Sequence, residues 1–136
     1  MSIEMLLISS GGAILTLVVL VFVFKKVPKG MNKDYFDRKW RETVKLLAQP
    51  ATLNLAIIEA DKLLDDAMKK AHFKGKTMGE RMVSAQRKFS NNDNVWAAHK
   101  MRNKLVHETD VKFNENETRT ALKQFQQALK DLGALL

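Results

Sequence analysis

The chain has 136 residues, which suffices for one folded domain, and it contains no cysteine, which excludes a disulfide framework and a thiolate metal site. Its formal net charge is +8. This balance favours contact with the phosphates of lipid headgroups or nucleic acid, the alternative being that lysine-rich helix faces are simply solvated.

The first element is an uncharged apolar segment from Met5 to Phe24. At about 1.5 Å per residue, its length as a helix is roughly 30 Å, the thickness of the hydrocarbon core of a bilayer. A cleaved signal peptide is the alternative, but the segment is preceded by Glu4 rather than by a basic residue, and Phe24 is followed by lysines, not by a small-residue cleavage site. Residues 1–26 are therefore predicted to be an uncleaved transmembrane anchor.

Basic residues follow this segment closely, whereas none precedes it. The asymmetry predicts a single-pass topology with the N-terminus outside and the following domain in the cytoplasm. Val27, Pro28 and Gly30 fall in a basic linker, residues 27–32, which is predicted to end the helix. The basic residues that set the orientation, and that also suit anionic lipid, are Lys25, Lys26, Lys29, Lys33, Arg38, Lys39 and Arg41.

Residues 33–136 are predicted to form an all-α domain, a bundle of four to five helices. Amphipathic periodicity marks five segments, about 34–48, 51–72, 77–88, 95–109 and 117–132. Pro50 ends the first of them. Thr77 and Glu80 have the spacing of a capping box, which predicts the start of the third.

The fourth segment carries the residues of most chemical interest. Arg102 lies at the edge of its apolar arc, and a charge that cannot be removed needs a partner or a pocket there. His99, Asn103 and His107 follow one another at intervals of four residues, so they form one polar stripe beside that arc. Imidazole groups exchange protons near neutral pH, so the stripe offers proton transfer.

In this region the sequence resembles the HEPN (higher eukaryote and prokaryote nucleotide-binding) superfamily. Arg102-Asn103-x-x-x-His107 is similar to the family's motif, an arginine and a polar residue followed by a histidine. The surroundings are similar as well: an acidic second helix that contains Asp61 and Asp65, Trp96 ahead of the motif, and an amphipathic helix that closes the domain. The resemblance extends over about residues 33 to 135.

The resemblance implies a helical bundle that dimerises with its two motif helices facing each other. Active members of the superfamily are metal-independent endoribonucleases, and many other members lack activity. By position, His107 would be the general acid or base, Arg102 would stabilise the phosphorane charge, and Asn103 would orient the phosphate or the histidine. These three residues are the predicted catalytic site, and no metal or cofactor is expected.

Purely structural roles are the alternative for the same residues. Arg102 would then pair with Asp61 or Asp65 inside the bundle, and His107 would pack at the end of its helix, where positive charge suits the dipole. His99 is expected at the surface or at the edge of the core, and Trp96 is expected in the core or an interface rather than as a base-stacking platform.

Three functions follow from these readings. The first is a membrane-anchored, metal-independent endoribonuclease that acts as a homodimer through the fourth helix. The second is a non-catalytic HEPN-like module that recruits a protein or nucleotide at the membrane. The third is a plain anchor with its basic face on lipid. The expected partners are the lipid bilayer, RNA or a nucleotide, and a second copy of the chain.

Overall fold

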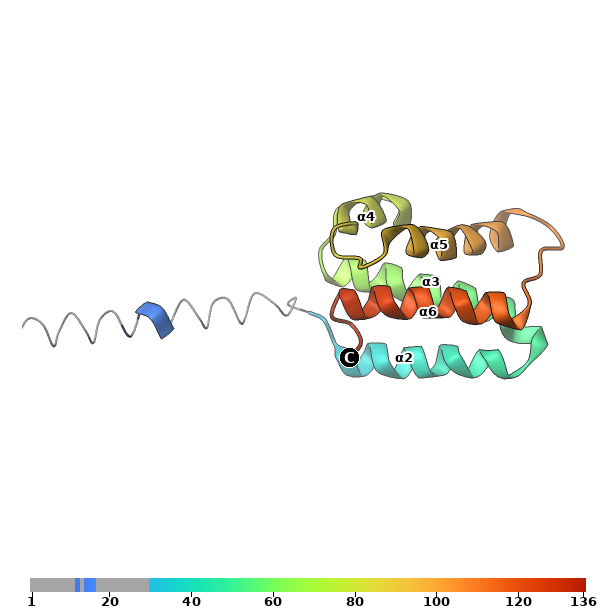
Figure 1. The fold of residues 1–136 in the computed structure, drawn as a ribbon, viewed down its shortest axis with the longest axis horizontal. Helices are drawn as coiled ribbons and strands as arrows, with labels where there is room; N and C mark the ends of the chain where they lie inside the picture. Colours follow the sequence, from blue (N-terminus) through green and yellow to red (C-terminus); the bar gives the residue numbers. More distant parts are fainter. Residues whose placement is uncertain (1–11, 13, 17–29) are drawn as a thin grey trace, which may run out of the picture.

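The structure is a computed structural model that describes residues 12, 14–16 and 30–136. Residues 30–136 form a bundle of five α-helices joined by short connections, with no strand in that range, which confirms the predicted all-α domain (Figure 1). In chain order the elements are α2 (Lys33–Lys45), the 3₁₀ turns η1 (Leu46–Ala48) and η2 (Pro50–Thr52), α3 (Leu53–Lys70), α4 (Met78–Ala85), α5 (Asn92–His107) and α6 (Glu115–Asp131).

The predicted transmembrane segment lies almost wholly outside the described residues. The four that are described, residue 12 and residues 14–16, are helical, and the Thr16 hydroxyl donates a hydrogen bond to the Gly12 carbonyl oxygen at 2.9 Å. Within the part of the chain that the structure describes, no helix combines the length and apolar character needed to cross a membrane. The anchor and its topology therefore stay predictions.

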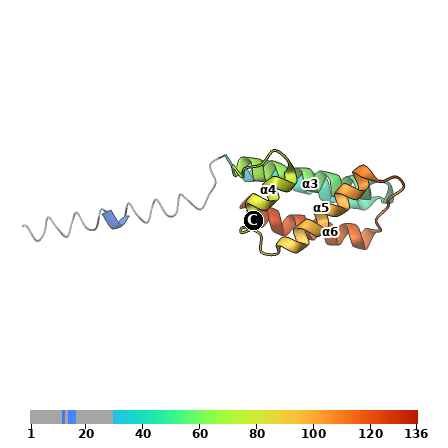
Figure 2. The ribbon, with the colours of Figure 1, turned by 90° about the horizontal axis from the view of Figure 1, so that it is seen from above.

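Helix α3 is the centre of the bundle. It packs against α2, α4, α5 and α6, and Figures 1 and 2 show α5 lying across α3 and α6 on the side away from α2. The periodicity of residues 51–72 predicts an apolar stripe from Leu53 to Ala71, and this stripe is buried except for Ala71, which is partly exposed. The buried members are Leu53, Ala56, Ile57, Ala60, Leu64, Ala67 and Met68.

Side-chain caps set the starts of α2, α4, α5 and α6, whereas α3 follows η2 without one. The capping box of Thr77 and Glu80 is present at α4, as predicted, and a second one, of Asn114 and Glu117, starts α6 two residues earlier than expected. Helix α5 begins at Asn92, three residues before the predicted start, because the Asn91 side chain accepts a hydrogen bond from a backbone N–H of its first turn.

A buried arginine holds the connection between α3 and α4. The Arg81 guanidinium donates to both carboxylate oxygens of Asp65, at 2.7 and 2.9 Å, and to the Gly75 carbonyl oxygen at 2.8 Å. Burial by itself raises the pKa of Asp65, but the hydrogen bonds and charge of Arg81, with a smaller effect of Lys69, outweigh it and hold that pKa below its ordinary value. The loop backbone is thus fastened to the interior of the bundle.

Candidate functional site

Helix α5 carries all the residues of the predicted catalytic site. It packs against α3 and α6, so one side of it faces the core and the other faces solvent. Arg102 and Asn103 are partly buried at the edge of the α3–α5 contact, and His107 is the last residue of the helix and is exposed.

Beneath Arg102 and Asn103 lies a buried pair formed by Asp61 of α3 and His99 of α5. Their side chains are 4% and 8% exposed, and the distance from Asp61 Oδ1 to His99 Nδ1 is 2.7 Å. Sequence reasoning placed His99 at the surface or core edge; it is buried, because Asp61 gives its imidazole a partner inside the bundle. The signal in the sequence was an aspartate in the middle of the otherwise buried stripe of α3.

Four side chains close into a ring around this pair, which we call the α3–α5 polar ring: Asp61, His99, Asn103 and Arg102. Asn103 Nδ2 lies 3.4 Å from His99 Nε2, and Asn103 Oδ1 accepts a hydrogen bond from Arg102 Nη1 at 3.2 Å. Arg102 Nε lies 3.5 Å from Asp61 Oδ2, which completes the ring. The prediction that Arg102 would pair with Asp61 or Asp65 is therefore met by Asp61, since Asp65 is taken by Arg81.

The chemistry of the four groups determines where the protons of the ring lie. Arginine can only donate, so the oxygen of the Asn103 amide faces Arg102 and its nitrogen faces His99. That nitrogen donates, so His99 Nε2 is the acceptor and the His99 proton lies on Nδ1, where the Asp61 carboxylate accepts it.

Arg102 is held only in part by the bundle. Its side chain is 34% exposed, and the contact with Asp61 is an attraction between charges, because the buried Nε has no hydrogen-bond partner within the described residues. By contrast, Arg81 makes three well-formed bonds. Arg102 therefore keeps donor capacity for a group that approaches from solvent.

The structure does not bring His107 together with Arg102 in one copy of the chain. Five residues of helix at 100° each place the two side chains about 140° apart around the α5 axis. Arg102 faces Asp61, while His107 is exposed and takes part in no hydrogen bond or ion pair within residues 30–136. Between them Val106 is 50% exposed on the outer face of α5.

Both tryptophans lie in or against the core, which is where the sequence predicted Trp96 to lie. Trp40 is buried in the core on α2. Trp96 is partly buried at the start of α5 and meets the His99 ring edge to face, with 5.8 Å between centroids. The Trp96 indole thus covers one side of the polar ring.

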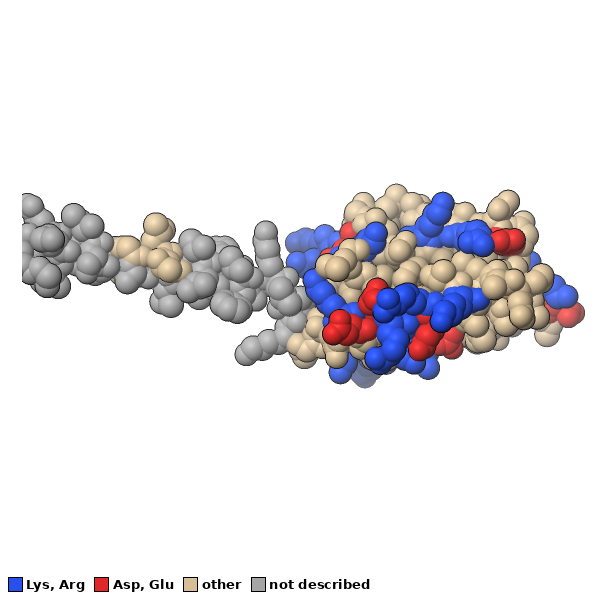
Figure 3. All heavy atoms as spheres, turned by 90° about the horizontal axis from the view of Figure 1, so that it is seen from below, with Lys and Arg blue, Asp and Glu red and all other residues tan. Residues whose placement is uncertain are grey.

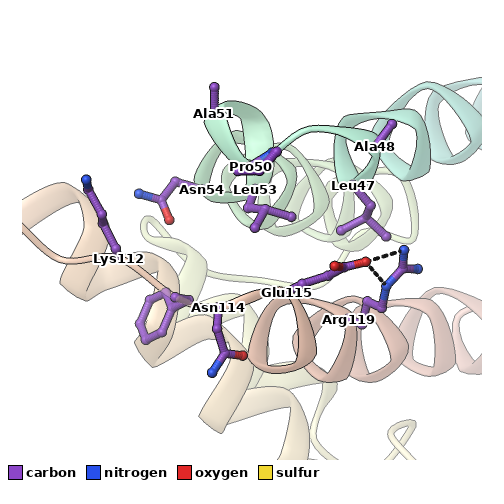
Figure 4. A pocket seen from close by; sticks show the side chains of 11 residues that line it. Leu47, Ala48, Pro50, Ala51, Leu53, Asn54, Lys112, Asn114, Glu115 and Arg119 are labelled. Atoms are coloured by element: carbon purple, nitrogen blue, oxygen red, sulfur yellow. Dashed lines mark hydrogen bonds and ion pairs between the residues drawn. The ribbon is translucent and has the colours of Figure 1, made fainter.

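The structure also has a hollow at the end of the bundle where η2 meets the connection to α6. Its volume is about 720 Å³, and its walls include Leu47, Pro50 and Leu53 on one side and Phe113 on the other. Figure 4 shows the ion pair of Arg119 with Glu115, whose shortest nitrogen–oxygen distance is 2.8 Å, at its floor. No residue of the predicted catalytic site lines it, so it is a separate feature.

Comparison with known proteins gives no relative for this chain: no protein-family model, no curated protein and no solved structure matches it. The likeness to HEPN domains thus stays a prediction that depends on the motif and on the helical bundle around it.

Proposed function

We propose that the chain is a membrane-anchored, HEPN-like domain that acts as a homodimeric, metal-independent endoribonuclease. The observation that carries this proposal is the state of Arg102: its guanidinium is oriented by Asn103 and Asp61, yet it is one-third exposed and retains free donors. On the same helix, His107 is exposed and without a partner within residues 30–136. A fixed guanidinium and a free imidazole are the groups needed for phosphodiester transfer without a metal.

In this reaction His107 takes the proton from a ribose 2′-hydroxyl, and the resulting oxygen attacks the adjacent phosphorus. The bond from phosphorus to the 5′-oxygen breaks, and that oxygen receives a proton from an imidazolium, the partner copy's His107 in a symmetric cleft. The products are a 2′,3′-cyclic phosphate and a 5′-hydroxyl. Arg102 supplies charge and paired hydrogen bonds to the phosphorane oxygens, which an arginine matches bidentately.

A second copy is needed because of the angle between the two side chains. With Arg102 and His107 about 140° apart on one helix, a single phosphate meets both groups more readily when one comes from each copy. Val106 supports a contact of this kind, because it is half exposed between them. The isologous contact of a twofold dimer would place both motifs at one interface.

A non-catalytic binding module is the second candidate, and the contact with Asp61 favours it. A buried carboxylate 3.5 Å from Arg102 Nε offsets part of the guanidinium charge and ties the side chain to the core. In that case the polar ring serves to order the α3–α5 interface, and a phosphate group of RNA or a nucleotide binds at its exposed edge without being cleaved.

The decisive experiment incubates the full chain with a labelled RNA in the presence of EDTA. We expect cleavage with 2′,3′-cyclic phosphate ends, and His107→Ala should reduce the rate by about 10²–10⁴-fold with the fold unchanged, as for loss of a general acid or base. Arg102→Lys should also impair cleavage, since an ammonium cannot reproduce the bidentate contact. His72→Asn is the matched control, because His72 is exposed and has a positive φ, which asparagine tolerates.

The outcomes separate the candidates. RNA binding without cleavage, unaffected by His107→Ala, would point to the binding module, and absence of both would contradict the two proposals together. The dimer is tested by Val106→Glu, which should shift the sedimenting mass to that of one copy. Val83→Glu on α4 is the control, because Val83 is 54% exposed and lies off α5.

A further inference from the structure

The C-terminal end of α3 and its connection to α4 carry a concentration of positive charge that the proposed function does not use. Residues 69–76 contain Lys69, Lys70, Lys74, Lys76 and His72 and no acidic residue. We call the four lysines the basic end. All four are exposed, and within residues 30–136 only Lys69 makes an ion pair, with Asp65 at 3.4 Å.

The surface of α2 offers a contrast. There Arg41 pairs with Asp37 at 2.8 Å and Lys39 with Glu42 at 3.4 Å, and Figure 3 shows Lys and Arg mixed with Asp and Glu across the face of the bundle that α2 forms. Positive charge on α2 is thus compensated in part by acidic residues of its own helix. At the basic end it is not.

The backbone of the basic end is built to a defined shape. Arg81 donates to the Gly75 carbonyl oxygen at 2.8 Å, the Ser84 hydroxyl donates to the Lys74 carbonyl oxygen at 2.6 Å, and the Lys76 N–H donates to a Glu80 carboxylate oxygen at 2.6 Å. A Cβ added at Gly75 would lie 2.6 Å from the Arg81 backbone nitrogen. These bonds fasten the main chain of residues 74–76 to α4, and the side chains of Lys70, Lys74 and Lys76 make no ion pair within residues 30–136.

The place of these residues in the bundle suggests what they contact. Lys69, Lys70 and His72 line a hollow of about 870 Å³ together with Gly30 and Tyr35, and Asp66 also lines it. Lys69 and Lys70 of the basic end thus lie beside residue 30, at the end of the bundle from which the chain leads to the uncharged segment Met5–Phe24 (Figure 1). If that segment crosses a bilayer, this end of the bundle faces the headgroups.

We infer that the basic end is a docking surface for anionic phospholipid headgroups, which holds the bundle in a fixed orientation against the membrane. The inference rests on the predicted anchor but not on RNA cleavage. Each lysine near an anionic surface is attracted to it, and the anchor raises the effective concentration of the surface, since the contact is made within one molecule. Because hydrogen bonds to Arg81, Ser84 and Glu80 already hold the backbone of residues 74–76, Lys74 and Lys76 lose little backbone freedom on docking.

The experiment uses the full chain in nanodiscs, either neutral phosphatidylcholine or the same lipid with one third phosphatidylserine, each with a headgroup spin label as quencher. The chain has no cysteine, so a single introduced cysteine takes one fluorophore. Gln86→Cys places the label two residues beyond Ser84, which bonds the basic end, and Ala51→Cys places it in η2 at the opposite end of the bundle.

We expect stronger quenching at Gln86→Cys in anionic than in neutral discs, no such difference at Ala51→Cys, and loss of the difference in 1 M salt, where charges are screened within about 3 Å. Changing the four lysines of the basic end to glutamine should remove the difference. The matched control changes four other exposed lysines, Lys45, Lys62, Lys104 and Lys123, and should leave it in place. Where the fourfold variant does not fold, Lys74→Gln with Lys76→Gln serves.

Two results would overturn the inference: equal quenching of the Gln86→Cys label in neutral and anionic discs, or an equal loss of the difference with the control substitutions. A third would be protection of this label by RNA in neutral discs, if changing the four lysines of the basic end abolishes that protection. The last would assign the basic end to RNA instead. If alkaline carbonate extracts the chain from membranes, the predicted anchor is wrong. If the chain does not cleave RNA in detergent, the proposed ribonuclease activity is wrong. Both results are distinguishable from a failure of lipid docking.

Discussion

Replacing Asp61 with alanine removes the one carboxylate of the α3–α5 polar ring. His99 Nδ1, on a side chain that is 8% exposed, then loses its hydrogen-bond partner, and the Arg102 guanidinium loses the negative charge 3.5 Å from its Nε. A buried donor without a partner costs about 1–3 kcal/mol. Loss of one partner from a fully buried ion pair costs roughly 3–5 kcal/mol, which we discount because Arg102 is one-third exposed.

We therefore expect Asp61→Ala to lower the free energy of unfolding by about 2–4 kcal/mol, a loss of roughly 10–25 °C in Tm for a bundle of this size. Asp61→Asn keeps an oxygen for His99 and should cost less. Arg102→Ala should cost the least, about 1–2 kcal/mol, because Asp61 keeps its shorter bond to His99.

Thermal unfolding of the full chain in mild detergent, followed by circular dichroism at 222 nm, measures this series. A melting temperature for Asp61→Ala close to that of the wild type would refute the reasoning. So would a greater loss for Arg102→Ala than for Asp61→Ala, since Arg102 would then be the main support of the ring rather than an exposed member of it.

Three further predictions concern other parts of the chain. The pKa of Asp65 is lower in the folded than in the unfolded chain, where it is about 3.9, so the ionised carboxylate stabilises the fold at pH values above about 3.9. In urea unfolding, the stability advantage of the wild type over Asp65→Asn should therefore be full at pH 7 and be lost as the pH falls through the folded pKa. Gly75→Ala should lower the free energy of unfolding by about 1–3 kcal/mol, since the new Cβ meets the Arg81 backbone. Gly30→Ala has open space around it and should cost about 1 kcal/mol from its positive φ alone. Thermal melts of the two variants measure the difference. Protein isolated from membranes should still contain the segment Met5–Phe24, and a reporter fused after Leu136 should be cytoplasmic; cleavage after residue 20 would contradict the predicted anchor.

Periodicity predicted the helices well and their ends less well. The buried stripe of α3 follows the i, i+3, i+4 pattern, so nearly every member predicted to be buried is buried. The starts of α5 and α6 were misplaced by two or three residues, because Asn91 and Asn114 cap them from within stretches that read as loop. A cap depends on the geometry of one side chain, and a stretch of polar residues does not indicate which of them forms it.

The site was predictable in composition but not in its connections. Sequence reasoning placed Arg102, Asn103 and His107 on one helix and named Asp61 and Asp65 as possible partners of Arg102. It could not choose between them, because the choice depends on Arg81, which comes from α4 and takes Asp65. The pairing of Asp61 with His99 was missed for a similar reason, since two residues 38 apart meet only through the packing of α3 on α5.

The hydrogen bonds of the polar ring run in one direction: His99 donates to Asp61, Asn103 donates to His99, and Arg102 donates to Asn103. Turning the Asn103 amide over would set its nitrogen against the arginine, donor against donor. In related chains these positions should therefore vary together rather than singly. A sequence that loses the histidine while it keeps the aspartate would need a new donor in its place.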